Sequence, residues 1–377
     1  MSDPAGGRAS LAMFAVVALA IAGFAFSLTP AATALDNRLL DVEWRVLRAA
    51  APAPAPDDIV IVGIDRATLE AIPAPPGLWH EALGEALARI AAAHPRAIGL
   101  DYPLPERSYD EIHPGLDLAL FRGLAAAVRG GTFVASLEID PVTRSARRIH
   151  TPFLAILTEP HLGIGLSARD DDGVTRRYSL VIPTEDGGFP TLAGRLCRAI
   201  SSRCNDGLID FALGPGFRKV SLRDVLAAPD AQSLAPVFRD RIVLVGNALP
   251  YTDRLNVPVN LAGWEAASHD SPTVVVHAQT LRTAMLGAAP QEASRPFAVV
   301  LSLLACFPLL VGRRVLGLAA AVLGMAALLG AAIVVLHAGL YVPVAAPFAT
   351  LLVAGLLPFV RRAKRLPTGL RNIPHSS

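Results

Sequence analysis

The stretch SRPFAVVLSLLACFPLLVGRRVLGLAAAVLGMAALLGAAIVVLHAGLYVPVAAPFATLLVAGLLPFVRRAKR (Ser294–Arg365) decides how the chain folds. From Pro296 onwards it is apolar except at Arg313-Arg314, around His337 and at its basic end. A helix needs roughly 20 mostly apolar residues to cross a bilayer core of about 30 Å, and spanning segments must satisfy their own backbone groups. None of the pieces has the polar face of a soluble surface helix. We therefore expect transmembrane helices over 294–312, 315–336 and 341–360.

Basic residues orient these helices, because Lys and Arg accumulate in cytoplasmic flanks. Arg313-Arg314 and the cluster from Arg361 to Arg365 bound opposite ends of the last two helices, whereas the link around His337 carries no Lys or Arg. The residues at 361–377 are therefore expected to form a short basic cytoplasmic tail. The region before Ser294 is expected outside the cytoplasm.

The N-terminus predicts one more crossing. Residues 1–10 are polar and carry Arg8, and an uncharged apolar run of about 18 residues follows, so we expect a cytoplasmic N-terminus and a transmembrane helix over 11–29. A cleaved signal peptide is the alternative, since small residues follow from Thr29 to Ala34. The length of the run and Pro30 favour an uncleaved anchor. The prediction is four transmembrane helices, with both termini cytoplasmic.

Composition agrees with a mixed architecture. The chain has 377 residues, of which 53% are hydrophobic and 18% charged. This is too apolar for an ordinary soluble protein and too charged for one confined to the membrane. The formal net charge is only +2, and the basic residues gather at membrane edges or alternate with acids, so we expect the lipid bilayer and no nucleic acid among its partners.

The exported region, 31–290, is long enough for one sizeable domain. Ile59–Ile64, Ala97–Leu100 and Thr132–Leu137 are short apolar runs typical of strands buried on both faces of a parallel sheet. Helical patterns over Trp79–Ala93 and Leu116–Val128 separate them. Strands alternating with helices predict an α/β domain with a mostly parallel, helix-covered sheet.

Several segments of the exported region resemble the CHASE2 family in their order and spacing. They are IVIVGID (Ile59–Asp65), AIGLDYPLPE (Ala97–Glu106), DDDGVTRRYSL (Asp170–Leu180), the GPG around Pro215 with Ser221 and Asp224, RIVLVGNALPYTD (Arg241–Asp253) and VVVHAQTL (Val274–Leu281). The resemblance covers about Leu35 to Gly287.

The resemblance implies an extracytoplasmic sensor domain of a bacterial receptor, placed in the inner membrane. In that family the last helix normally leads into a cytoplasmic output domain, for which this chain leaves about seventeen residues. No catalytic activity is therefore carried over. The tryptophan- and proline-rich segment that follows the family's first strand is reduced here to Pro73–His80.

Asp65 and Asp101 are the first candidate site residues, because each follows a predicted parallel strand. Ligands of open α/β sheets bind at the carboxyl ends of strands. If the two strands are neighbours, the carboxylates suit a hard cation such as Ca²⁺ or Mg²⁺, or a cationic ligand. The alternative is that each aspartate caps a helix or a turn.

Asp253, His277 and Arg176 complete the candidate ligand site. Asp253 follows the strand ending near Gly246, and His277 lies at the start of the last helix of the domain. A lone histidine is also common as a structural residue. Arg176 follows the turn Asp170–Gly173 and either binds a ligand or stabilises that turn.

Enzyme motifs are absent from the sequence. It contains no G-x-S-x-G, no G-x-x-x-x-G-K-[ST] and no H-E-x-x-H. We therefore expect no enzymatic activity and no cofactor.

Cys197 and Cys204 lie in the exported region, and an oxidising compartment favours a disulfide between them. Cys306 lies in a predicted membrane helix and is expected to be a free thiol.

Two functions fit these observations. The first is a membrane sensor that detects an unknown small ligand and relays the signal through its helices to a separate cytoplasmic or membrane partner. Small residues within Val315–Leu336 allow close helix approach, and hence a homodimer. The second is a structural or assembly subunit of an envelope complex that docks another protein and senses nothing.

Overall fold

The structure, a computed structural model, describes residues 4–363 apart from 141, 142, 144, 186, 267 and 312. The expected basic tail from residue 364 onwards, including Lys364 and Arg365, lies outside the described residues. The chain forms two compact units, one of residues Trp44–Pro290 and one of Met1–Glu43 with Gln291–Ser377. The division falls inside helix α2 (Pro30–Ala50).

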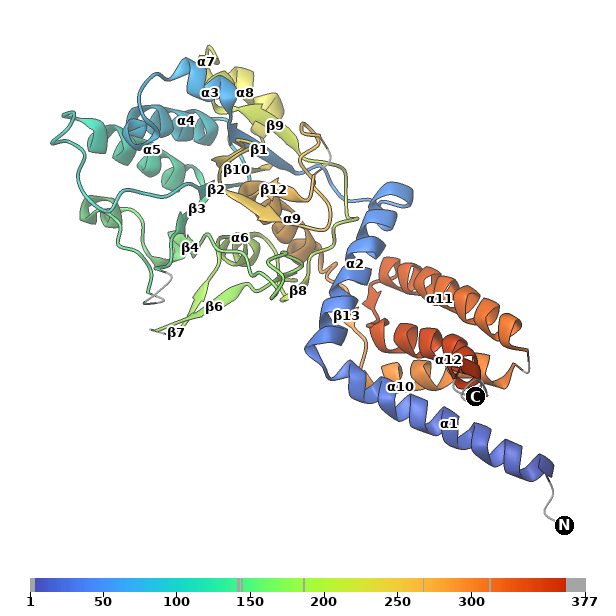
Figure 1. Cartoon of the computed structure of the whole chain (residues 1–377). Coiled ribbons are helices and arrows are strands. Elements are labelled where there is room, and N and C mark those ends of the chain that lie inside the picture. The colour runs from blue at the N-terminus through green and yellow to red at the C-terminus, as the bar shows by residue number, and fades with distance from the viewer. Residues whose placement is uncertain are drawn as a thin grey trace, which may run out of the picture. The chain divides into compact units, whose positions relative to one another are not determined.

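A six-stranded, all-parallel sheet forms the centre of the unit Trp44–Pro290 (Figure 1). Its strands, in spatial order, are β4 (Leu162–Ile164), β3 (Thr132–Leu137), β2 (Ala97–Asp101), β10 (Ile242–Asn247), β1 (Ile59–Ile64) and β9 (Arg218–Ser221). The predicted α/β class with a parallel sheet is thus confirmed. The strands are nearly continuous apolar runs because both faces of the sheet are covered.

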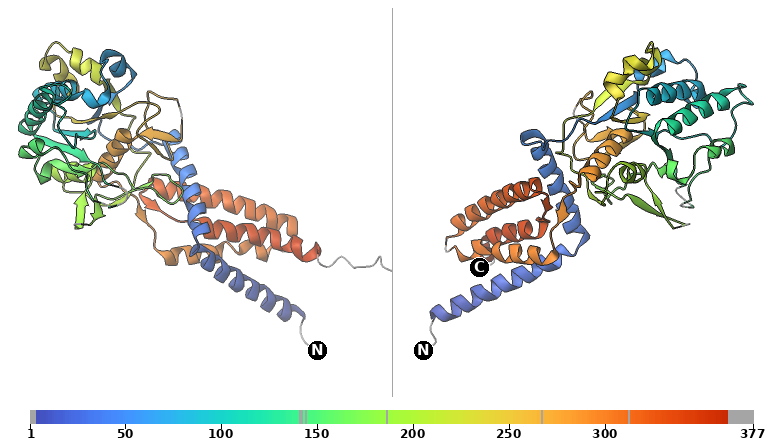
Figure 2. Two further views of the ribbon diagram at one scale, coloured as in Figure 1. Left: turned by 60° about the vertical axis from the view of Figure 1, so that its left-hand side comes forward. Right: turned by 180° about the vertical axis from the view of Figure 1, so that it is seen from behind.

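Helices cover both faces of the sheet (Figure 2). On one face, helices pack over a core that contains Val60, Ile98 and Val243. These helices are α4 (His80–Ala92), α5 (Leu116–Gly130), α7 (Leu222–Ala227) and α8 (Ala231–Phe238). On the other face lie α6 (Leu192–Ile200) and α9 (Thr273–Leu286). Because successive strand residues point to opposite faces, each face has its own set of side chains at the sheet edge.

The two helices α4 and α5 cross at a pair of glycines. A Cβ atom on Gly123 would lie 2.2 Å from the carbonyl oxygen of Gly84, and a Cβ on Gly84 would lie 2.4 Å from that of Ala119. Both clashes are with backbone atoms, which no side-chain rotation relieves. The crossing therefore requires glycine in both helices.

Short elements complete the unit. They are α3 (Arg66–Ala71), the 3₁₀ turns η1 (Pro76–Leu78), η2 (Thr151–Ala155) and η3 (Glu159–His161), and the two-stranded pairs β5 (Arg177–Tyr178) with β8 (Gly207–Leu208), β6 (Val181–Thr184) with β7 (Gly187–Pro190), and β11 (Arg254–Asn256) with β12 (Asp270–Pro272).

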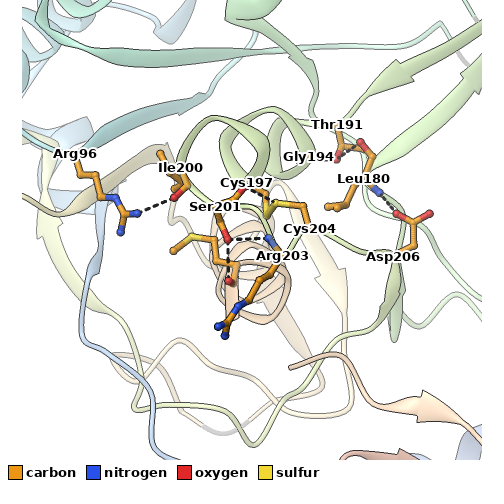
Figure 3. The surroundings of a disulfide bond; sticks show 11 residues. Arg96, Leu180, Thr191, Gly194, Cys197, Ile200, Ser201, Arg203, Cys204 and Asp206 are labelled. Atoms are coloured by element: carbon orange, nitrogen blue, oxygen red, sulfur yellow. Dashed lines mark hydrogen bonds between the residues drawn. A yellow bond between two sulfur atoms is a disulfide. The ribbon is translucent and has the colours of Figure 1, made fainter. Parts of the chain in front are cut away.

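The structure contains the Cys197–Cys204 disulfide, with the two Cα atoms 6.0 Å apart (Figure 3). It joins α6 to the loop that follows it. In that loop the Ser201 hydroxyl donates to the carbonyl of Met285, near the end of α9, at 3.0 Å. The loop that the disulfide closes is therefore hydrogen-bonded to the end of α9.

The second unit is built from apolar helices. They are α1 (Pro4–Ser27), α10 (Arg295–Leu304), the 3₁₀ turn η4 (Phe307–Leu310), α11 (Arg314–His337) and α12 (Ala345–Ala363), together with the first part of α2 and the strand pair β13 (Gln291–Glu292) and β14 (Leu340–Tyr341). Small residues allow close packing, since a Cβ on Gly355 of α12 would lie 2.7 Å from that of Ala321 in α11. The Asp36 carboxylate accepts from the backbone N–H of Ala345 at 2.7 Å, which caps the start of α12.

The apolar helices differ from the expectation of four full-length crossings. Judged by length and composition over the described residues, α11 alone is long and apolar enough to cross a membrane, and the bent pair Met13–Ser27 and Pro30–Ala50, at 81°, forms a second candidate if counted as one span. The segment 294–312 is not one helix, because α10 ends at Leu304 and η4 follows. Pro308 has no backbone N–H to continue an α-helix. The helix expected over 341–360 begins four residues later, at Ala345.

We predict that Gly123→Ala lowers the free energy of unfolding by about 1–3 kcal/mol, the usual cost of overpacking. At an open helical position the same change would instead stabilise by up to about 1 kcal/mol. All three tryptophans, Trp44, Trp79 and Trp264, lie in the unit Trp44–Pro290, so tryptophan fluorescence during urea unfolding follows that unit. The control is Gly263→Ala, where a Cβ would meet nothing within 4 Å. Equal midpoints for the two variants would contradict the prediction.

Candidate functional site

Asp65 lies at the end of β1, where it caps helix α3. Its carboxylate accepts from the backbone N–H of Thr68 at 3.2 Å, from the Ser221 hydroxyl at 2.7 Å and from the Lys219 ammonium at 2.8 Å. Burial acts to raise the pKa of Asp65, but the hydrogen bonds from Lys219 and Ser221 outweigh it and lower the pKa below its usual value. The carboxylate is therefore ionised, and its oxygens already accept hydrogen bonds from the protein. In the structure Asp65 thus caps a helix, which is the alternative role given above.

Asp101 lies at the end of β2 and does not meet Asp65. Strand β10 runs between the two strands, so that Gly246 pairs with Gly63 on one side and with Asp101 on the other. The condition for a pair of neighbouring carboxylates, that β1 and β2 are adjacent strands, is therefore not met. Over the described residues no group of three or more His, Cys, Asp or Glu side chains is placed to hold a metal ion.

Asp101 instead faces His277 of α9, on the face of the sheet that α6 and α9 cover. The Asp101 Oδ1 and His277 Nε2 atoms are 3.8 Å apart, and their side chains are only 8% and 3% exposed. Asp101 Oδ2 and His277 Nε2 are buried without a hydrogen-bond partner in the structure. Such atoms are costly to bury, so the pair is a site under electrostatic strain.

Burial shifts both groups of this pair toward their uncharged forms. It raises the pKa of the Asp101 carboxyl well above its usual value, and the negative charge of Asp253 adds to the effect. Burial also lowers the pKa of His277 to about 4, although a hydrogen bond with the backbone of Gly165 acts to raise it. Both shifts favour the uncharged pair, a protonated carboxyl and an unprotonated imidazole, over the ion pair.

Asp253 and Arg176 differ in their relation to that pair. Asp253 is exposed, adopts a positive φ of 53°, and acts on Asp101 through its charge. Arg176 is buried and donates to Asp170 at 2.9 Å and to Asp172 at 2.8 Å. Its guanidinium stabilises the turn, which is the second of the two roles considered for Arg176. Of the five candidate residues, only Asp101, His277 and, through its charge, Asp253 form one site.

A cavity of about 570 Å³ opens on the other face of the same sheet edge, beside α4 and α5. It is lined by residues of four segments that follow β1, β2 and β3: Pro76, Gly77, Trp79, His80 and Leu83; Tyr102, Pro103, Leu104, Pro105, Glu106, Arg107 and Tyr109; Leu120; and Glu138 and Arg147. This volume lies in the usual range for small-molecule pockets, and its position at the carboxyl ends of parallel strands is where open α/β sheets bind ligands.

The walls of the cavity are held by specific hydrogen bonds. The indole N–H of Trp79 donates to the carbonyl of Ala74 at 2.7 Å, and the hydroxyl of Tyr102 donates to that of Pro76 at 2.9 Å. The segment Pro73–His80 is thereby fastened to the loop after β2. The sequence reading singled out this segment only as a reduced family feature and missed that it forms one wall of a cavity.

A histidine–aspartate cluster lies at one side of the cavity. The Asp117 carboxylate accepts from the Ser108 hydroxyl at 2.6 Å and lies 3.4 Å from His80 Nδ1 and 3.5 Å from His150 Nε2. The His80 ring packs edge-on against Tyr109, with centroids 4.9 Å apart. Burial opposes ionisation of Asp117, but the hydrogen bonds of Ser108 and Tyr109 outweigh it and lower the pKa of this carboxyl. The cluster anchors the loop between β2 and α5.

Comparison with known families matches residues 12–319 to the CHASE2 domain. The match covers most of the chain, from the first helix through the sheet to the apolar C-terminal region, and the chain belongs to the CHASE2 family. CHASE2 domains are extracytoplasmic sensor domains, so a sensory role is consistent with membership of this family. No curated protein and no solved structure matches the chain.

We predict that Asp101→Asn removes a contribution to stability that is lost as the pH rises. The unfolded carboxyl loses its proton near pH 3.9, whereas the folded carboxyl, whose pKa is raised, keeps its proton to a higher pH. His277 acts in the opposite direction, because its folded pKa of about 4 lies below its ordinary value of about 6.5, so its contribution is lost as the pH falls through this range. The two effects oppose each other in the wild type, so the stability of the variant should rise more steeply with pH between about 5 and 6.5.

The measurement is urea unfolding of wild type and variant at pH 5, 6.5 and 8, followed by tryptophan fluorescence. The control is Asp224→Asn, which removes an exposed carboxylate. Parallel curves for wild type and Asp101→Asn across this pH range would show that the pKa of the Asp101 carboxyl is not raised in the folded state.

Proposed function

We propose that this chain is a membrane-anchored sensor whose extracytoplasmic domain binds a small ligand in the cavity beside α4 and α5. The cavity is the observation that carries the proposal. It lies where α/β sheets bind ligands, and its walls come from segments far apart in the chain, so a bound molecule contacts all of them. The proposal assigns binding and no catalysis to the chain.

The anchoring part of the proposal has four crossings of a bacterial inner membrane, over 11–29, 294–312, 315–336 and 341–360. The exposed apolar side chains of α11 support it, since Val315, Leu323 and Val334 are about 70% exposed. In the most apolar stretch of this helix only 11% of the residues are buried. A core helix of a soluble protein would bury such side chains. The broken α10–η4 segment is the crossing with the least support from helix length.

The relay part of the proposal requires a separate partner. A ligand changes a conformational equilibrium only if it binds two states with different affinity. Tightening of the cavity walls would be passed along α9, whose end at Leu286 is five residues before Gln291 of the membrane unit. The receiver would be a cytoplasmic or membrane signalling protein, or a second copy of this chain. The open face at Gly330, where a Cβ would meet nothing within 4 Å, is compatible with such a helix contact.

We predict that Gly77→Phe, which fills the cavity, abolishes stabilisation by ligand. A Cβ on Gly77 meets only the Tyr109 ring, at 3.9 Å, so the substitution is tolerated while the larger ring occupies the cavity. The full chain in lipid nanodiscs is heated with the low-molecular-weight fraction of a periplasmic extract. A ligand at 100 times its Kd stabilises by about 2.7 kcal/mol, or a few degrees in midpoint. Wild type and the surface control Gly263→Phe should show this shift, and Gly77→Phe should not.

If no fraction shifts the midpoint and an envelope protein copurifies with the chain at equal stoichiometry, a structural or assembly role replaces sensing. If all three proteins shift equally, the ligand binds outside the cavity.

We predict that a phosphatase inserted near His150 is active and a cytosolic fluorescent reporter there is dark, whereas after Ser377 the phosphatase is inactive and the fluorescent reporter is bright. The expectation follows from the arginines at 313, 314, 361 and 362, which hold their helix ends in the cytoplasm. Paired phosphatase and cytosolic fluorescent fusions at both positions measure it. Cytosolic fluorescence at His150 would reverse the proposed topology.

A further inference from the structure

The charged side chains that line the cavity are equal in number of each sign, but their ion pairs are uneven. Glu106, Glu138 and Arg147 form one group, in which Arg147 lies 2.9 Å from Glu138 and 3.6 Å from Glu106. Two carboxylates thus share one guanidinium, which leaves an excess of negative charge. Arg107 also lines the cavity, is exposed, and has no ion-pair partner within the part of the chain that the structure describes.

The ion pairs at the cavity are open to rearrangement. The side chains of Arg147, Glu106 and Glu138 are 48%, 55% and 47% exposed. Surface pairs of this kind contribute about 0–1 kcal/mol, so a ligand group replaces them at little cost. A cation competes with Arg147 for the two glutamates, and an anion pairs with Arg107.

The opposite part of the lining is apolar. Leu83, Leu104 and Leu120 are buried beneath the cavity, and the half-buried rings of Tyr102 and Tyr109 stand at its side. A pocket of this composition binds an apolar body and orients it through a few polar groups. It therefore suits neither a bare ion nor a fully polar sugar.

We propose that the cavity binds a zwitterionic small molecule with an apolar body, of the amino-acid or short-peptide class, with its ammonium group at Glu106 and Glu138 and its carboxylate at Arg107. A purely cationic ligand leaves Arg107 without a partner, and a purely anionic ligand faces the excess carboxylate. A dipolar ligand satisfies both and keeps the lining neutral, which gives specificity through complementary charge. This inference rests on the proposed sensing function and adds the class of ligand to it.

The test is calorimetric titration of the full chain in nanodiscs with apolar dipeptides in three matched forms. One form has both ends free, one has an acetylated amine and one has an amidated carboxylate. The free form should bind at least about tenfold more tightly than either blocked form, which corresponds to about 1.4 kcal/mol. Free L-phenylalanine, phenethylamine and 3-phenylpropionate form the same comparison for a single residue.

Variants assign the two ends of the ligand. Arg107→Gln should weaken the free and the amine-blocked dipeptide about tenfold and leave the amidated form unchanged. Glu106→Gln should weaken the free and the amidated forms. Matched controls are Arg148→Gln and Glu111→Gln, which are exposed and outside the lining. They should leave all three affinities unchanged.

Either of two results would overturn the inference: equal binding of blocked and free forms, or no binding of any free amino acid or dipeptide at about 10 mM, above the millimolar range of weak specific ligands. If the panel fails while a periplasmic fraction still stabilises wild type and not Gly77→Phe, the ligand class is wrong and sensing stands. If neither binds, both proposals fail.

Discussion

The burial of a parallel sheet on both of its faces is the constraint on which the extracytoplasmic fold depends. The strands β1, β2 and β10 are apolar on both faces, so helices must lie close against each side. Glycines make that approach possible: a Cβ on Gly99 would lie 2.8 Å from Leu196 of α6, and one on Gly246 would lie 2.8 Å from Val274 of α9. With the Gly84–Gly123 crossing of α4 and α5, these contacts hold the edge of the sheet rigidly enough to carry a site.

The same geometry places the buried acid and a wall of the cavity on two consecutive residues, Asp101 and Tyr102. Leu100 packs into the core under α4, Asp101 points the other way to His277 of α9, and Tyr102 turns back toward the cavity. A ligand that moves Tyr102 therefore acts on the residue next to the buried acid. Because Asp101 and His277 hold buried polar atoms without a hydrogen-bond partner in the structure, small displacements there change the energy strongly. This adjacency gives the proposed sensing a physical route from the cavity to α9.

The apolar unit shows how the same small residues serve different contacts. Gly317, Ala321 and Gly324 of α11 lie against other elements of the unit, since a Cβ on Gly317 would meet the carbonyl of Pro308 at 3.2 Å and one on Gly324 would meet Leu351 at 3.0 Å. Internal packing therefore uses part of the stripe of small residues from which the sequence predicted dimerisation. Ala319, Ala326, Ala327 and Gly330 of the same helix are exposed and leave room for a further helix.

The local pattern of the chain determined the α/β class, the parallel strands, the position of α11 and the family, because period and composition are local properties that each segment carries by itself. It also identified Asp65 as a candidate site residue, with helix capping as its alternative role. Which strands are neighbours was decided only by the tertiary structure: β10 is formed by residues 242–247, far along the chain, and yet it separates β1 from β2. The meeting of Asp101 with His277, and of Pro76 with Glu138 and Arg147 around one cavity, depends on contacts between distant segments. No window of sequence contains such contacts, because their free energy comes from packing the whole sheet at once.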